Sequence, residues 1–315
     1  MKRVFAGVVA VTAALTLSAC GGSSDPLSNT PAGGPSKAPT TAAADPASLT
    51  VGSANFPESQ LLAEIYAGAL EAKGIKVSKK PNIGSRETYI PALQDGSIDL
   101  IPEYSGTLLQ YFDKSAKETS DADVYTALQQ KVPAPLIVLD KSAAEDKDAV
   151  VVTKETATKW NLKTIADLAP HGGEVTFGGP PEFQKRPDGI PGLQKNYGLQ
   201  IKGYKSLDAG GPLTVNALKT GVVQAADLFT TDPSITANNF VVLEDPKSNF
   251  AAQSVLPLIN SSKVGPKVKA ALNAVSAKLT TDTLIELNGK LNAPSKPDPA
   301  AVAAEWLKAQ GLDKG

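Results

Sequence analysis

Residues 49–79 read LTVGSANFPESQLLAEIYAGALEAKGIKVSK, and this stretch decides the fold class. Residues 49–52 are typical of a short strand, and residues 75–79 alternate as a second strand. Between them, Pro57 opens a helix that Gly74 closes, as expected for these residues at helix ends. The helix carries one apolar stripe at helical spacing, made of Leu61, Leu62, Ile65, Ala69 and Leu70. This order predicts a β-α-β unit of an α/β fold.

The same alternation continues and restarts after residue 148. Further strands are predicted at residues 98–101, 149–153, 175–177, 223–229, 240–243 and 255–259. Further helices are predicted at residues 86–94, 104–112, 164–168, 213–219, 266–279, 282–291 and 299–310, with Thr164 and Asp298 as caps. We therefore expect two α/β lobes, each a mainly parallel sheet flanked by helices, with a cleft between them. Lobe I would comprise residues 49–147 and 240–315, and lobe II residues 148–239.

The N-terminus has the pattern of a lipoprotein signal peptide over residues 1–19. Two basic residues precede an apolar run at 4–17 that is too short to span a membrane. The run ends in Leu17-Ser18-Ala19-Cys20, which resembles the site cut by the lipoprotein signal peptidase. Cys20, the only cysteine, is the predicted lipidation site; the alternative is a small buried apolar side chain. Residues 20–48 are rich in Pro, Ala, Thr and Ser and predict a disordered spacer.

Composition argues against several classes of function. The chain has 31 Lys and Arg against 32 Asp and Glu, so it offers no electrostatic footprint for nucleic acid. Its one histidine, His171, lies in a turn-like Pro-His-Gly-Gly segment, and no His, Cys and Asp cluster has metal-ligand spacing. Gly178-Gly179-Pro180-Pro181 lacks the lysine of a phosphate-binding loop. We expect no enzymatic activity, no cofactor, no metal site and no disulfide.

Three stretches carry a more specific signal: residues 51–59 (VGSANFPES), residues 82–85 (NIGS) followed by 99–107 (DLIPEYSGT), and residues 182–193 (EFQKRPDGIPGL). A weaker fourth is residues 226–232 (ADLFTTD). In order and spacing they resemble the substrate-binding proteins of ABC importers for osmoprotectants, such as glycine betaine, choline and proline betaine. The resemblance covers the chain from residue 49 onward and implies a two-lobed fold of the periplasmic-binding-protein type.

The ligand chemistry of that family is physically restrictive. A quaternary ammonium has no N–H to donate, so aromatic faces must hold it by cation–π attraction. A betaine carboxylate suits the forked donor of an arginine. The resemblance places Tyr104 and Phe229 in the aromatic cage, Arg186 on the carboxylate with Phe183 beside it, and Thr107 and Asn55 as polar contacts. Each could instead be an ordinary core, helix-start or solvated residue, and for Tyr204 packing is the preferred interpretation.

Two positions depart from the family pattern. Ala54 stands where many members have a lysine, and Asp148 where they have another cage tyrosine. A lost charge-assisted hydrogen bond costs about 1.5–3 kcal/mol and a lost cation–π face about 2 kcal/mol. Together they would weaken betaine binding roughly a hundredfold to a thousandfold. A ligand with an aromatic or polyhydroxylated body is therefore an alternative, and so is an envelope interaction lipoprotein that no longer transports.

The resemblance also implies partners and location. We expect a monomer that closes on a small solute by a hinge motion and delivers it to a permease with a cytoplasmic ATPase. The lipid on Cys20 would be the only membrane contact, and it would hold the protein on the outer face of the cell membrane.

Overall fold

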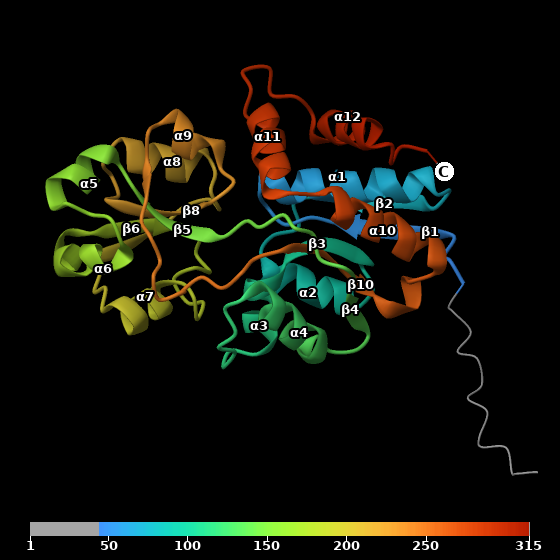
Figure 1. Cartoon of the computed structure of the whole chain (residues 1–315), viewed down its shortest axis with the longest axis horizontal. Helices are drawn as coiled ribbons and strands as arrows, with labels where there is room; N and C mark the ends of the chain where they lie inside the picture. The colour runs from blue at the N-terminus through green and yellow to red at the C-terminus, as the bar shows by residue number, and fades with distance from the viewer. Residues whose placement is uncertain (1–43, 315) are drawn as a thin grey trace, which may run out of the picture. The chain divides into compact units, whose positions relative to one another are not determined.

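The computed structural model describes residues 44–314, which form two lobes with one five-stranded sheet each (Figure 1). The sheet of lobe I has the order β2-β1-β3-β10-β4 and consists of β1 (Ser48–Gly52), β2 (Lys76–Lys80), β3 (Leu100–Tyr104), β4 (Leu136–Val138) and β10 (Val255–Asn260). The sheet of lobe II has the order β7-β6-β8-β5-β9 and consists of β5 (Asp148–Val152), β6 (Thr176–Gly179), β7 (Gly203–Ser206), β8 (Ala225–Phe229) and β9 (Val241–Val242).

The predicted two-lobed α/β architecture is confirmed, but both sheets are mixed and not mainly parallel as expected. In lobe I, β1 is parallel to β2 and β3, whereas β10 is antiparallel to β3 and β4. In lobe II, β6 is parallel to β7 and β8, whereas β5 is antiparallel to β8 and β9. The antiparallel strands β5 and β10 are the first strands after each crossing between lobes. They enter without the crossover helix that makes successive strands parallel.

Helices cover both faces of the lobe I sheet. One face packs on α1 (Pro57–Ala72), α10 (Pro266–Lys278), α11 (Thr281–Leu291) and α12 (Pro299–Gln310); the other packs on α2 (Arg86–Gln94), α3 (Ser105–Phe112) and α4 (Asp121–Lys131). The predicted apolar stripe of α1 is buried and contacts α10 and α12. Pro299 opens α12, and the Asp298 carboxylate accepts a hydrogen bond from the Ala300 amide at 2.8 Å, as expected for this cap.

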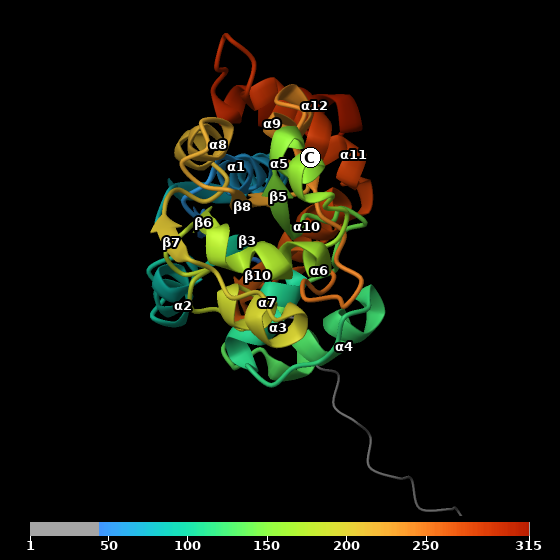
Figure 2. The same ribbon diagram turned by 90° about the vertical axis from the view of Figure 1, so that its left-hand side faces the viewer.

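Lobe II has shorter helices, and the view in Figure 2 is turned toward them. They are α5 (Lys154–Trp160), α6 (Ile165–Leu168), α7 (Ile190–Tyr197), α8 (Pro212–Lys219) and α9 (Pro233–Ala237). Thr164 caps α6 in a reciprocal capping box with Asp167, as predicted for this residue. The sequence patterns missed α4, α5, α7, α9, β4 and β7, several of which are too short to develop a clear period.

Two element boundaries differ from the sequence prediction in ways that affect the cleft. Tyr104 was expected to begin a helix, but it ends β3, where it pairs with Val255 of β10. The return to lobe I was expected at residue 240, but β9 still pairs with β5 of lobe II. Phe250 packs in the core of lobe II and Ala251 in that of lobe I, so the chain crosses back between these two residues.

The two crossing segments lie side by side and are hydrogen-bonded to each other. Glu145 and Ser254 form an antiparallel bridge. The Asp146 amide donates to the carbonyl of Gln253 at 3.2 Å, and the Val255 amide donates to that of Ala144 at 3.0 Å. A short two-stranded connection of this kind can bend at one place, which makes it the natural hinge between the lobes.

The predicted signal peptide, Cys20 and most of the predicted spacer lie outside the described residues. The end of the predicted spacer is ordered, contrary to expectation. The Asp45 carboxylate accepts hydrogen bonds from the amides of Lys267 and Val268 at the start of α10, at 2.8 and 3.2 Å. The free amides of a helix N-terminus attract a carboxylate, so residue 45 is fixed to the folded body. Within residues 44–314, no helix combines the length and the apolar character needed to cross a membrane.

Candidate ligand-binding cleft

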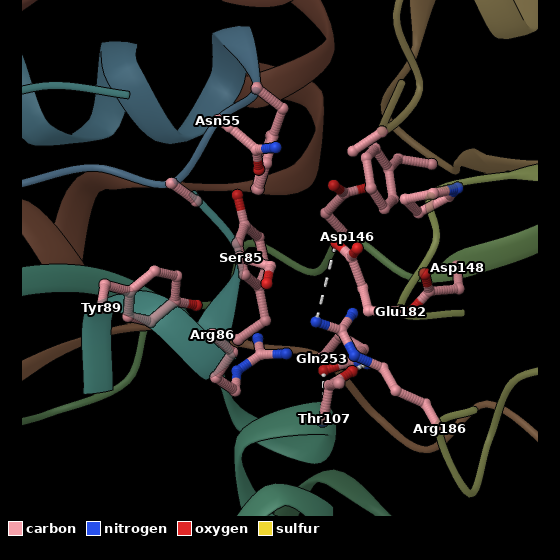
Figure 3. A pocket seen from close by; sticks show the side chains of 16 residues that line it. Asn55, Ser85, Arg86, Tyr89, Thr107, Asp146, Asp148, Glu182, Arg186 and Gln253 are labelled. Atoms are coloured by element: carbon pink, nitrogen blue, oxygen red, sulfur yellow. Dashed lines mark hydrogen bonds and ion pairs between the residues drawn. The ribbon is translucent and has the colours of Figure 1, made fainter. Parts of the chain in front are cut away.

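A cavity lies between the lobes, where strands β1, β3, β6 and β8 end (Figure 3). It encloses about 550 Å³ of space, part of it open to solvent. Ligands of open α/β sheets bind at the carboxyl ends of strands, because the loops that follow them are free to vary. The lining residues are Ala54, Asn55, Phe56, Ser85, Arg86, Tyr89, Tyr104, Thr107, Asp146, Asp148, Pro180, Glu182, Arg186, Ala209, Phe229 and Gln253.

Three aromatic side chains form one wall of the cleft. The ring centroid of Phe56 lies 6.0 Å from that of Tyr104 and 5.3 Å from that of Phe229. Phe56 and Tyr104 belong to lobe I and Phe229 to lobe II, so the wall is complete only while the lobes are together. Sequence analysis placed Tyr104 and Phe229 here and missed Phe56. The available signal was its place in the first motif segment, directly before the Pro57 that opens α1.

The hydroxyl group of Tyr104 is held by a buried carboxylate. It donates to Oε1 of Glu58 at 2.6 Å, and the Thr231 hydroxyl of lobe II donates to Oε2 at 2.6 Å. Asn288 of α11 donates to the same Oε2 at 2.5 Å. Burial and the neighbouring Glu58 carboxylate raise the pKa of Tyr104, so its ring presents a neutral phenol. This network fixes one aromatic face and also joins the two lobes.

The two arginines of the cleft already have carboxylate partners. Arg86 is buried and forms a bidentate pair with Glu103, at 2.9 Å from Nε to Oε1 and 2.7 Å from Nη2 to Oε2. Arg186 reaches across the cleft from lobe II to Glu87 of α2 at 3.3 Å. It also lies 4.0 Å from Glu182 of its own lobe (Figure 3). The pair with Glu103 is buried and well formed, whereas that of Arg186 is longer and more exposed. Arg186 is therefore the more available cation.

The predicted polar contacts also reach the cleft. Asn55 follows β1 and lines it. Thr107 lies in the first turn of α3, where its amide donates to Oε1 of Gln253 at 3.0 Å. Its hydroxyl pairs with the Gln253 amide group and lies 3.5 Å from Oδ2 of Asp188. Thr107 thus connects the hinge segment of Gln253 with the lobe II loop that carries Asp188.

Phe183 does not line the cleft, and its expected place beside Arg186 is wrong. The side chain is 2% exposed in the core of lobe II, stacked on Phe177 with centroids 5.6 Å apart. The loop that follows turns back on it, because the Ile190 amide donates to the Phe183 carbonyl at 3.1 Å. A Cβ at Gly189 would lie 1.8 Å from that carbonyl oxygen, so only glycine fits. This turn points Phe183 inward and leaves Arg186 at the cleft.

Tyr204 packs as preferred in the sequence analysis. Its ring is nearly parallel to that of Phe177, and its hydroxyl donates to the Pro180 carbonyl at 2.7 Å. It supports the cleft loop from behind and is absent from the cleft lining.

The remaining polar surface of the cleft is acidic. Asp146 accepts a hydrogen bond from the backbone amide of Thr231 at 3.0 Å and another from the hydroxyl of Thr230 at 3.2 Å. Asp148, one of the two departures from the family pattern, lines the cleft, as does Ala54, the other. Burial and the nearby Asp188 raise the pKa of Asp148 to about 6. Within residues 44–314, no cluster of three or more His, Cys, Asp or Glu side chains is arranged to hold a metal ion.

Comparison with known proteins finds similar proteins over most of the chain. The family model of the substrate-binding domain of the ABC-type glycine betaine transport system matches residues 47–309. The chain is 30% identical to the glycine betaine-binding protein YehZ of Escherichia coli K12, over 84% of this chain and 92% of the relative. It is 27% identical to the ergothioneine transport permease and binding protein EgtU of Helicobacter pylori, with 84% of this chain covering 48% of that longer protein. A crystal structure of a glycine betaine/carnitine/choline ABC transporter component superposes with a TM-score of 0.67 at 27% identity, over 84% of this chain and all of the other.

Proposed function

Since the chain belongs to the family of substrate-binding domains of ABC-type glycine betaine transport systems, we propose that it binds a quaternary ammonium compound in its interlobe cleft. Proteins of this family bind a solute for transport and do not transform it, so the chain is a transport component and not an enzyme. The observation that carries the proposed site is the wall of Phe56, Tyr104 and Phe229, contributed by both lobes.

The wall suits the trimethylammonium group. Each methyl group carries part of the positive charge, and three ring faces can surround it without any hydrogen bond. Phe229 of lobe II would approach the cation only as the cleft closes. Binding would therefore favour the closed form. The hydrogen bonds that the Thr231 hydroxyl of lobe II donates to Glu58 and accepts from Asn288 of lobe I would hold it.

Location and partners belong to the same proposal: the family supports a transport role outside the cytoplasm, and the signal-peptidase-like residues 17–20 support the anchor. The protein would act outside the cytoplasmic membrane, attached through a lipid on Cys20, and would deliver its solute to a permease with its ATPase. A membrane-fraction assay of the wild type and Cys20→Ala would test the anchor. The variant should be released into the medium or the soluble extracytoplasmic fraction.

Titration calorimetry with glycine betaine, choline, carnitine and ergothioneine tests the binding function. The variant Phe229→Ala removes one aromatic face and should weaken the best ligand about thirtyfold, the equivalent of about 2 kcal/mol. Trp160→Ala is the matched control, because Trp160 stacks on His171 away from the cleft and should leave affinity unchanged. If the folded wild type binds none of the four compounds, the proposed function is wrong.

A further inference from the structure

The cleft holds more negative groups than its cations can neutralise. Arg86 is paired with Glu103, and Arg186 faces both Glu87 and Glu182. The cleft carboxylates of Asp146 and Asp148 remain without a salt bridge to any residue of the described range 44–314. The ligand therefore meets acidic side chains that no cation of the described residues neutralises.

A second observation points to a missing partner beneath Asp148. In the antiparallel pairing of β5 and β8, Asp148 lies opposite Phe229, and Val150 lies opposite Asp227. Opposed residues point to the same face of a sheet, as do residues two apart. The Asp227 carboxylate therefore lies on the face that carries Asp148 and Phe229 into the cleft. It is 1% exposed, and neither of its oxygens has a hydrogen-bond partner in the described structure.

Asp188 adds a third carboxylate to the same place. It lies on the loop that carries Arg186, is 4% exposed, and its Oδ1 also lacks a partner among the described residues. Its charge is one cause of the raised pKa of Asp148, and the charges of Asp148 and Asp188 contribute to the raised pKa of Asp227. The charges of Asp148, Asp188 and Asp227 thus influence one another, and three oxygens of Asp188 and Asp227 have no donor among the described residues. Buried carboxylates of this kind are normally satisfied by a positive charge or by N–H and O–H groups.

Glycine betaine supplies neither a net positive charge nor a hydrogen-bond donor for these carboxylates. Its ammonium has no hydrogen to donate, and its own carboxylate adds a further negative charge to the cleft. To pair with Arg186, that carboxylate must displace Glu87 or Glu182. A cation with a hydroxyl or amino group and no carboxylate avoids both difficulties, since its charge can rest on the aromatic wall while its donor faces Asp148.

We propose that this cleft selects a cation that carries an O–H or N–H donor and no carboxylate, with the Asp148 carboxylate accepting the donor. This inference rests on the proposed function, because it specifies the class of ligand for the same aromatic site. Asp148 is then the residue that determines specificity, in place of an aromatic ring. Choline is the simplest compound of this class.

Three ligands of similar size separate the alternatives in titration calorimetry at neutral pH. Choline has the cation and the donor, its methyl ether has the cation only, and glycine betaine has a carboxylate in place of the donor. Choline should bind about tenfold or more tightly than either, the range expected for one charge-assisted hydrogen bond. In Asp148→Asn, choline and its ether should bind within about twofold of each other, and glycine betaine should gain affinity.

Asp113→Asn is the matched control, because Asp113 pairs with Lys131 on the outer surface of lobe I. It should keep the wild-type order of the three ligands. Wild-type affinity for glycine betaine or for the ether equal to that for choline would overturn the inference while leaving the proposed function standing. Failure of all three ligands to bind folded wild-type protein would overturn the inference, and the proposed function as well if carnitine and ergothioneine also fail to bind.

Discussion

Choline should bind more weakly as the pH falls, because the cation favours an ionised Asp148. Burial and the charge of Asp188 place the pKa of Asp148 at about 6 in the ligand-free protein. Above this value the carboxylate is ready to accept the ligand. Below it, choline must first displace a proton, and each further pH unit then costs about a factor of ten in affinity.

The size of the effect follows from that pKa. An acid with a pKa of about 6 is about 97% ionised near pH 7.5 and about 9% ionised near pH 5. The dissociation constant of choline should therefore rise about tenfold between these two conditions, the equivalent of about 1.4 kcal/mol. Asp146 also lines the cleft, and Asp188 and Asp227 are buried close to Asp148; burial is the first cause of the raised pKa of each. Their protonation as the pH falls would weaken the attraction for a cation further.

The assay is choline titration by calorimetry across this pH range, in wild type and in Asp148→Asn. The variant has no carboxylate to titrate at this position. The change in its dissociation constant for choline between pH 7.5 and pH 5 should therefore be about tenfold smaller than in the wild type. Circular dichroism at each pH would establish that the protein remains folded. The assignment of Asp148 as the acceptor would be refuted if the wild-type dissociation constant for choline changed by less than about twofold between pH 7.5 and pH 5. It would also be refuted if the Asp148→Asn variant showed the same pH dependence of choline binding as the wild type.

Three further predictions concern the framework of the cleft. Asp227→Asn should raise the melting temperature of the ligand-free protein at neutral pH, because it removes a buried charge without a partner. Since burial raises the pKa of Asp227, this group takes up a proton as the pH falls, and the melting temperature of the wild type should then approach that of the variant. Glu58→Gln should weaken ligand binding about tenfold or more through loss of charge-assisted hydrogen bonds at the cage, with Glu64→Gln on the outer face of α1 as the unaffected control, both measured by calorimetry. Gly189→Ala should lower stability by about 2 kcal/mol or more in chemical denaturation, whereas Gly173→Ala, where a Cβ meets nothing within 4 Å, should not.

Local patterns were sufficient to predict the framework of the fold. The apolar stripe of α1, the prolines that open α1 and α12, and the alternation of strands each act within a few residues. Short elements such as α9 and β7 depend on tertiary contacts. With five residues in α9 and four in β7, the sequence shows no recognisable hydrophobic period. The direction of β5 and β10 was also out of reach, because it depends on where the chain enters each sheet.

The candidate site was predictable where a residue directly follows a strand. Tyr104 and Phe229 end β3 and β8, so their positions in the family motifs were enough to bring them to the cleft. Phe183 and Phe56 show the limit. Both are aromatic residues in motif segments, yet the turn closed by Gly189 directs Phe183 into the core, while the start of α1 leaves Phe56 at the cleft. Sequence spacing alone does not encode the path of a loop.

The acidic surplus connects ligand choice with closure of the cleft. Asp148 and Asp227 belong to lobe II, whereas Asp146 lies on the crossing segment and Glu58 on lobe I. Bringing the lobes together without a cation places the lobe II carboxylates of Asp148 and Asp227 closer to Glu58 of lobe I as water leaves, and like charges repel more strongly as water is excluded. A bound cation reverses the sign of that contribution, so the closed form would be favoured only when the cleft holds a positive charge. The same aspartates that choose the ligand would then also oppose closure of an empty cleft.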